Sequence, residues 1–123
     1  MDKIDVNEVE INGEVYVKKS STPSLALPVD GMPYIIHRSR AGIFAGYLSQ
    51  KEGQEVVLVN SRQLWSWTGA ATLSQLAVDG TNNPSGCKVP MAVPERTLPE
   101  TMEMLTCTEK ARKSIEGLPV WKR

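Results

Sequence analysis

The middle of the chain contains three apolar segments, residues 34–38, 42–49 and 55–60, separated by short turn sequences. All three are rich in β-branched, aromatic or other apolar residues of the kind that suits extended strands. The turns between them are too short for anything but antiparallel neighbours. Gly42 and Gly46 interrupt the second segment, which indicates a bulge or the close approach of a backbone or a ligand. The pattern therefore predicts an antiparallel meander.

Two later segments have helical patterns. Residues 72–79 place Leu73, Leu76 and Ala77 on one face, and the following Gly80 suits a helix end. A second helix is predicted near the C-terminus. Thr106 and Glu109 form a capping box, an apolar stripe follows at Cys107, Ala111 and Ile115, and Gly117 can end the helix. The predicted fold class is α+β: an antiparallel β-rich core, either a meander or a small sandwich, with a short middle helix and a C-terminal helix.

The N-terminal part differs in composition from the rest. Asn12-Gly13 lies between two alternating segments, and this dipeptide favours a type I′ turn, so residues 1–18 are predicted to form a β-hairpin. Residues 19–31 contain prolines and serines without an apolar period and are predicted to be a linker. The main domain is expected over residues 32–123. Within it, residues 81–86 have loop composition, and prolines at 90, 94 and 99 are expected to break the segment that follows.

Charge and hydropathy exclude several classes of protein. Lysine plus arginine equals aspartate plus glutamate, 14 each, so no overall field attracts the chain to a nucleic acid polymer or an anionic membrane. The apolar runs are too short to span a bilayer, and the polar start does not resemble a signal peptide, so a cytoplasmic protein is expected. Cys87 and Cys107 lack metal-ligand spacing and are expected to be small buried residues. No metal site or cofactor is predicted.

The segment from Asn60 to Trp67 is the best candidate for a binding site, because it combines an arginine with two tryptophans. Arginine can pair with phosphate through two hydrogen bonds, and an indole can stack on a nucleobase. On a regular strand, Trp65 and Trp67 would share one face while Arg62 projects from the other, so the site would need a second element. The alternative is that the indoles belong to the core. The predicted ligand contacts are Arg38, Arg62, Trp65, Trp67, Asn82 and Arg112.

No catalytic signature is present, so the chain is not expected to be an enzyme. It lacks a Gly-x-Ser-x-Gly elbow, a Walker loop and a Gly-x-Gly-x-x-Gly motif. The single histidine, His37, has no acidic neighbour in sequence to orient its ring, and a structural role is expected for it. Arg112 and Lys113 have i,i+4 partners in Glu116 and Glu109, which is also ordinary helix-surface chemistry.

Several segments resemble a family of short phage and prophage proteins long classed as of unknown function. The resemblance covers about residues 32–121, and the segments that carry it are Met32-Pro33-Tyr34, Ala41-Gly42-Ile43-Phe44-Ala45-Gly46-Tyr47-Leu48, Glu55-Val56-Val57-Leu58, Leu64-Trp65-Ser66-Trp67-Thr68-Gly69-Ala70, Leu73-Ser74-Gln75-Leu76-Ala77 and Thr108-Glu109-Lys110-Ala111-Arg112-Lys113-Ser114-Ile115. Such proteins are similar to the first-described anti-Thoeris family, phage proteins that sequester immune signals without degrading them.

This resemblance implies a function and an assembly. The ligands would be cyclic ADP-ribose isomers or cyclic oligonucleotides, bound in the cytosol of a host bacterium. The fold would be β-rich with C-terminal helices, and the chain would form homo-oligomers with pockets at subunit contacts. An aromatic ring and an arginine sandwiching adenine would correspond to Trp65 or Trp67 with Arg62 or Arg112. The N-terminal hairpin and linker lie outside the resemblance.

Two other functions remain open on the sequence alone. The protein could inhibit a host protein by steric contact, using the exposed tryptophans and the apolar C-terminal tail of Leu118, Val120 and Trp121. It could also bind single-stranded DNA, in which case retention would fall steeply with salt. The balanced charge disfavours the DNA-binding alternative.

Overall fold

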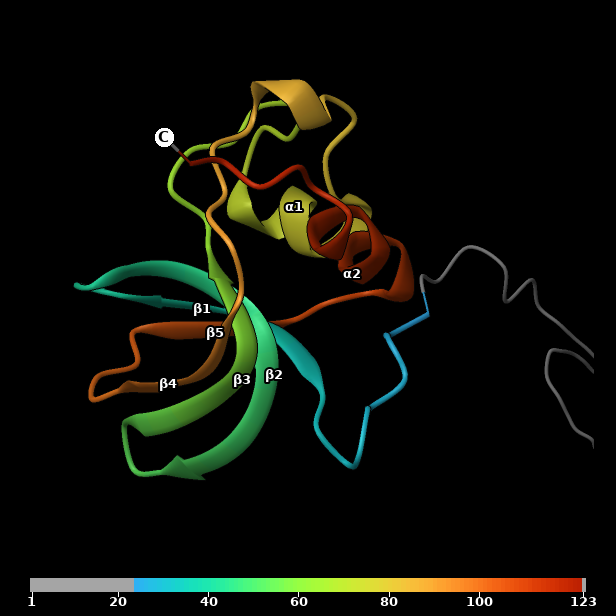
Figure 1. Ribbon diagram of the computed structural model, residues 1–123. Coiled ribbons are helices and arrows are strands. Elements are labelled where there is room, and N and C mark those ends of the chain that lie inside the picture. Colours follow the sequence, from blue (N-terminus) through green and yellow to red (C-terminus); the bar gives the residue numbers. More distant parts are fainter. Residues whose placement is uncertain (1–23, 123) are drawn as a thin grey trace, which may run out of the picture.

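A computed structural model describes residues 24–122 of the chain. Five strands form one antiparallel sheet in the order β4-β3-β2-β1-β5, and two helices lie together on one face of it (Figure 1). The elements are β1 (Tyr34–Ser39), β2 (Gly42–Glu52), β3 (Glu55–Gln63), α1 (Leu73–Asp79), the short 3-10 turn η2 (Pro84–Gly86), β4 (Val93–Leu98), β5 (Glu103–Thr106) and α2 (Glu109–Glu116). The predicted α+β class is confirmed.

The β1–β2–β3 meander is the one predicted from the three apolar segments. The β2–β3 pair shifts register between Ala45 and Tyr47, opposite Asn60, which has a positive φ of 52°. Gly46 lies at this bulge because a Cβ atom there would be only 2.7 Å from the Cβ of Ser61. Gly46 was expected to mark a bulge or the close approach of a backbone, and the structure contains both. A bulge of this kind bends its strand and increases the local twist.

Strand β4 is an element that the sequence interpretation missed. The prolines at 90, 94 and 99 were expected to break this segment, yet Val93–Leu98 pairs with β3 along its length. Since β4 is an edge strand, the missing N–H of Pro94 costs the sheet no internal hydrogen bond when it faces outward. The prediction of a break at Pro94 is therefore wrong, because β4 continues through this residue.

The C-terminal helix begins two residues later than its predicted capping box. Thr106 is still extended in β5, where it pairs with Ile35, so the box of Thr106 with Glu109 is wrong. Thr108 is the N-cap instead, and its hydroxyl accepts a hydrogen bond from the Ala111 amide at 3.1 Å. The predicted cap of α1 is confirmed at its C-terminal end by Gly80, which has a φ of 72°.

The two faces of the sheet carry separate apolar clusters. The larger packs under the helices and includes the predicted stripe of Cys107, Ala111 and Ile115, each fully buried. The smaller lies on the opposite face and consists of Ile35, Phe44, Val56, Leu58 and Leu98. The C-terminal tail returns to the domain, where Leu118 is buried and the Trp121 amide donates to the Val89 carbonyl at 3.0 Å.

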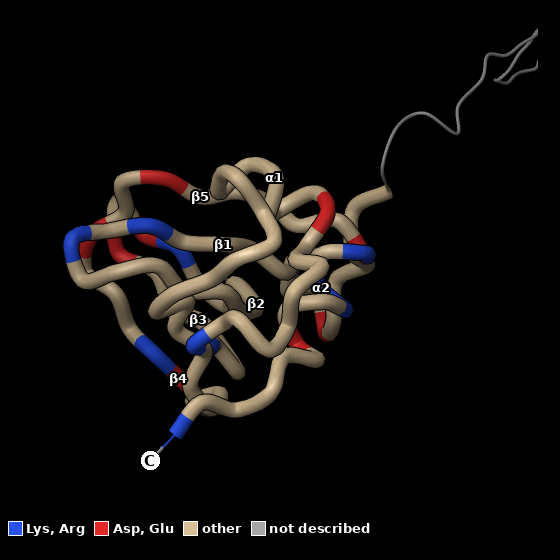
Figure 2. Tube along the Cα trace, turned by 90° about the horizontal axis from the view of Figure 1, so that it is seen from above, with Lys and Arg blue, Asp and Glu red and all other residues tan. Residues whose placement is uncertain are grey.

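The segment before β1 also contacts the domain. Its amide at Ala26 donates to the Cys107 carbonyl, and its Ser24 carbonyl accepts from Glu109. The hairpin predicted over residues 1–18 lies outside the described residues. Basic and acidic positions are interspersed along the chain path in Figure 2, and no helix in residues 24–122 is long and apolar enough to cross a membrane.

Candidate functional site

The two tryptophans of the candidate segment lie just beyond the end of β3 and have different surroundings. Trp65 is 62% exposed, whereas Trp67 is half-buried and packs against the larger cluster. Ser66, between them, pairs with Lys88 through two backbone hydrogen bonds of 3.2 and 2.7 Å. Both indoles border one hollow of about 280 Å³, whose wall consists of Ala41, Gly42, Ile43, Gln63, Leu64, Trp65 and Trp67. The segment therefore contributes one core indole and one surface indole to the same depression.

A third tryptophan joins this surface from the C-terminal tail. The rings of Trp65 and Trp121 are stacked, with centroids 6.5 Å apart and planes 14° from parallel. The ammonium of Lys88 lies 5.8 Å from the Trp121 ring centre, which is a cation–π distance. We name Trp65, Trp121 and Lys88 the aromatic platform. It presents flat apolar rings beside one positive charge.

Arg62 does not belong to the platform. It is 5% exposed, and its guanidinium lies in the interior between β3 and the C-terminal tail. All five of its N–H donors are used, on the carbonyl oxygens of Val89, Pro90, Ile115, Leu118 and Pro119 at 2.9–3.3 Å. Burial lowers the pKa of Arg62 from its ordinary value. The guanidinium thus has no donor left for a phosphate.

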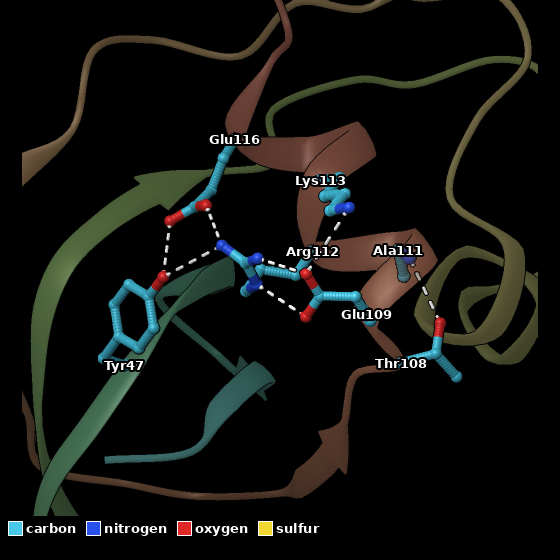
Figure 3. Close-up of polar contacts among 7 residues, drawn as sticks. All are labelled: Tyr47, Thr108, Glu109, Ala111, Arg112, Lys113 and Glu116. Carbon is cyan, nitrogen blue, oxygen red and sulfur yellow. Dashed lines mark hydrogen bonds and ion pairs between the residues drawn. The ribbon is translucent and has the colours of Figure 1, made fainter. Parts of the chain in front are cut away.

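Arg112 is also occupied within the protein, as Figure 3 shows. It pairs with Glu109 on one side, and on the other with Glu116, whose carboxylate also accepts from the Tyr47 hydroxyl at 2.7 Å. The hydrogen bond to Glu109 is the main reason that the pKa of Arg112 is raised and that of Glu109 lowered. Lys113 adds a weaker pair to Glu109 at 3.8 Å. The two predicted i,i+4 pairs are both present.

The other predicted contacts lie elsewhere. Arg38 forms an ion pair with Glu103 of the neighbouring strand at 2.9 Å. Asn82 borders a second hollow of about 220 Å³, together with Gly69, Gln75, Asp79, Gly80, Thr81 and Lys110. Of the six predicted residues, the structure brings only Trp65 and Trp67 together around one hollow.

His37 and the cysteines are placed as structural groups. His37 is fully buried on β1, and its Nε2 lies 2.9 Å from the hydroxyl of Thr101, which donates its own proton to the Gln54 carbonyl. Nε2 must therefore be the protonated nitrogen. Burial raises the pKa of the Cys107 thiol to about 12, which makes it a poor nucleophile at neutral pH. Within residues 24–122 there is no group of three His, Cys, Asp or Glu side chains that could hold a metal ion.

Arg96 on β4 is a residue that the sequence interpretation did not single out. Its guanidinium lies 4.6 Å from the centre of the Phe44 ring, and its Nε donates to the hydroxyl of the buried Ser61 at 2.8 Å. Burial lowers the pKa of Arg96, and no carboxylate of the described chain lies within ion-pair distance of it. No local pattern marks this arginine, because both of its partners come from other strands.

Comparison with known proteins identifies the family but no characterised relative. Neither the curated proteins nor the solved structures compared with the chain include a match. The family described as Domain of unknown function (DUF6948) matches residues 31–115, which contain strands β1 to β5, most of α2, and the hollow with Trp65 and Trp67. Since this match covers well over half of the 123 residues, the chain belongs to the DUF6948 family.

Proposed function

We propose that the protein binds a cyclic nucleotide signal and sequesters it without cleaving it, with Trp65 as the stacking surface for a base. The observation that carries this proposal is the stacked pair of Trp65 and Trp121, in which Trp65 is still 62% exposed, since exposed aromatic side chains that lie together mark binding surfaces. Stacking of a base on such a ring contributes about 1–3 kcal/mol. The neighbouring Lys88 supplies a positive charge for an anionic ligand.

The size of the hollow favours a pocket shared between subunits. Pockets that enclose drug-sized ligands measure about 300–1,000 Å³. The hollow beside Trp65, at about 280 Å³, suits one base better than a whole cyclic nucleotide. A second copy of the chain could cover the rest of the ligand, and we therefore propose a homo-oligomer with the ligand at a subunit contact.

Sequestration needs a closed, tight site but no general base, metal or nucleophile. The only histidine of the chain is His37, which is buried and bonded to Thr101. The resemblance to anti-Thoeris proteins adds the choice of ligand, cyclic ADP-ribose isomers or cyclic oligonucleotides. It also supports a role in phage counter-defence within the cytosol of a host bacterium.

A retention experiment separates sequestration from catalysis. The full chain is incubated with cyclic ADP-ribose isomers and with cyclic di- and trinucleotides, washed, heated, and the released material analysed by mass spectrometry. Recovery of an intact ligand from the wild type and from Met102→Ala, but not from Trp65→Ala, is the expected result. Met102 is a matched control because it is also a large exposed apolar residue, at 54%. A cleaved product would mean an enzyme, and no retained ligand would contradict the proposal.

A second candidate function is inhibition of a host protein by direct contact. The observation that favours it is a row of exposed apolar side chains before β1, with Leu25, Leu27 and Val29 exposed by 60%, 80% and 44%. Exposed apolar residues that lie together are typical of protein interfaces. Capture of one host protein by the wild type, lost with Leu25→Ser plus Leu27→Ser and kept with Trp65→Ala, would support this function over sequestration.

A further inference from the structure

We infer that the guanidinium of Arg96, which lies over the ring of Phe44, is an oxyanion-binding group, and that it binds a phosphate of the nucleotide whose base stacks on Trp65. This inference rests on the proposed function and supplies the arginine that the platform lacks. Arg62 and Arg112, the two arginines expected to work with the tryptophans, are held by backbone carbonyls and by Glu109 and Glu116 respectively.

The guanidinium of Arg96 is fixed in orientation without being neutralised. Its Nε donates to the hydroxyl of Ser61, and its central carbon Cζ lies over the Phe44 ring, 4.6 Å from the ring centre. These contacts leave the two terminal amino groups without a partner among residues 24–122. Because the side chain is only half-buried, those groups are the part of it that can meet solvent. A rigid fork of this kind is suited to two parallel hydrogen bonds with phosphate.

The Phe44 ring connects Arg96 with the wall of the hollow. A Cβ atom on Gly42 would lie 3.6 Å from the tip of the Phe44 ring and 3.1 Å from the amide nitrogen of Gln63. Gly42 and Gln63 both border the hollow that Trp65 and Trp67 share. The Phe44 ring therefore has the guanidinium over its face and its tip near Gly42. Gln63, which pairs with Phe44 across β2 and β3, borders the hollow as well, so a base in the hollow and a phosphate at Arg96 would be linked through Phe44 and Gln63.

The alternative is that Arg96 only covers the Phe44 ring. Titration calorimetry of the full chain with inorganic pyrophosphate separates the two roles. The expected result is binding by the wild type and by Arg38→Lys, and affinity about tenfold lower in Arg96→Lys, which keeps the charge but loses the fork. Arg38 is the matched control because its guanidinium is already paired with Glu103. No binding of pyrophosphate by the wild type, or equal affinities for the two lysine variants, would overturn the inference.

A measurement on the wild type keeps the inference testable if Arg96→Lys does not fold. The Nε–Hε resonance of Arg96 must shift on addition of pyrophosphate, while that of Arg62 stays unchanged; a stationary Arg96 resonance would overturn the inference. Adenosine, which has no phosphate, then tests the base site alone through tryptophan fluorescence. Arg96→Lys should weaken the binding of cyclic ADP-ribose and leave the binding of adenosine unchanged. An equal loss of affinity for both ligands would overturn the role of Arg96. Failure of adenosine to bind the wild type would contradict the proposed stacking site and not the oxyanion site.

Discussion

Arg62 on β3 donates a hydrogen bond of 2.9 Å to the carbonyl oxygen of Leu118, 56 positions later in the chain. The same guanidinium bonds Val89 and Ile115, so one side chain joins the sheet, the segment after η2 and the C-terminal tail. The tail in turn brings Trp121 onto Trp65. Arg62 thus fixes the tail that carries Trp121, although it is not itself part of the aromatic platform.

Replacing Arg62 should affect stability before binding. Arg62→Ala leaves several interior carbonyls without donors and is expected to lower the free energy of unfolding by at least about 3 kcal/mol. Urea unfolding followed by far-UV circular dichroism measures this loss. Arg38→Ala, which removes an arginine with an exposed ion pair, is the control and should cost less than about 1 kcal/mol. Equal losses for the two variants would contradict the structural role of Arg62.

The buried His37 should make stability depend on pH. Burial lowers its pKa in the folded state, so the unfolded chain binds the proton more readily. The stabilisation is complete above the unfolded pKa of about 6.5, and it is lost as pH falls from there towards the lower folded pKa. Urea unfolding between about pH 7.5 and pH 5 should show the decline. His37 is the only histidine, so His37→Gln should remove most of this dependence; an unchanged slope in that variant would contradict the account.

The bulge at Gly46 should not tolerate a side chain. A Cβ atom there would be 2.7 Å from the Cβ and 2.8 Å from the Cα of Ser61, so Gly46→Ala must push β3 away from β2. A loss of about 1–3 kcal/mol in unfolding free energy is expected. Gly53→Ala is the comparison, because that site has open space and only an unfavourable φ of 60°. Thermal unfolding should rank Gly46→Ala as the less stable variant, and the reverse order would argue against the close approach.

The stack of Trp121 on Trp65 should shield part of the Trp65 ring from solvent. Trp121→Ala removes one partner ring and is expected to make Trp65 more accessible to acrylamide, with a fluorescence maximum at longer wavelength. The change in unfolding free energy should be modest, since neither ring is buried. Because Trp67 also fluoresces, both proteins carry Trp67→Phe, and the reference carries Trp121→Phe, so that Trp65 is the only tryptophan in each. Unchanged quenching would mean that the two rings do not stack in solution.

The parts of the fold that rest on local patterns could be predicted, whereas those that rest on distant partners could not. The meander, the α1 cap at Gly80 and the stripe of Cys107, Ala111 and Ile115 follow from spacing along the chain. Strand β4 was missed because Pro94 is acceptable only at a sheet edge, and strand order is a non-local property. The capping box failed because Thr106 pairs with Ile35.

The candidate site shows the same division. The sequence places two tryptophans beside an arginine, but neither the exposure of Trp65 nor the use of each arginine could be predicted from it. Arg62 is held by carbonyls from residues 89–90 and 115–119, and Arg96 is oriented by Ser61 and Phe44. The parity argument does not apply to the indoles, because β3 ends at Gln63 and both tryptophans lie beyond it. Arg62 is buried, whereas Trp65 is exposed and Trp67 packs against the larger cluster.

The central claim is that Trp65 stacks on a base of a ligand that the protein keeps intact. Equilibrium dialysis of cyclic ADP-ribose isomers and cyclic oligonucleotides against the wild type, Trp65→Ala and Met102→Ala tests it most directly, with mass spectrometry of both chambers. We expect at least one ligand to accumulate intact with the wild type and Met102→Ala, and its affinity for Trp65→Ala to fall about tenfold or more. Equal affinity in all three proteins, or a cleaved ligand in either chamber, would contradict the account.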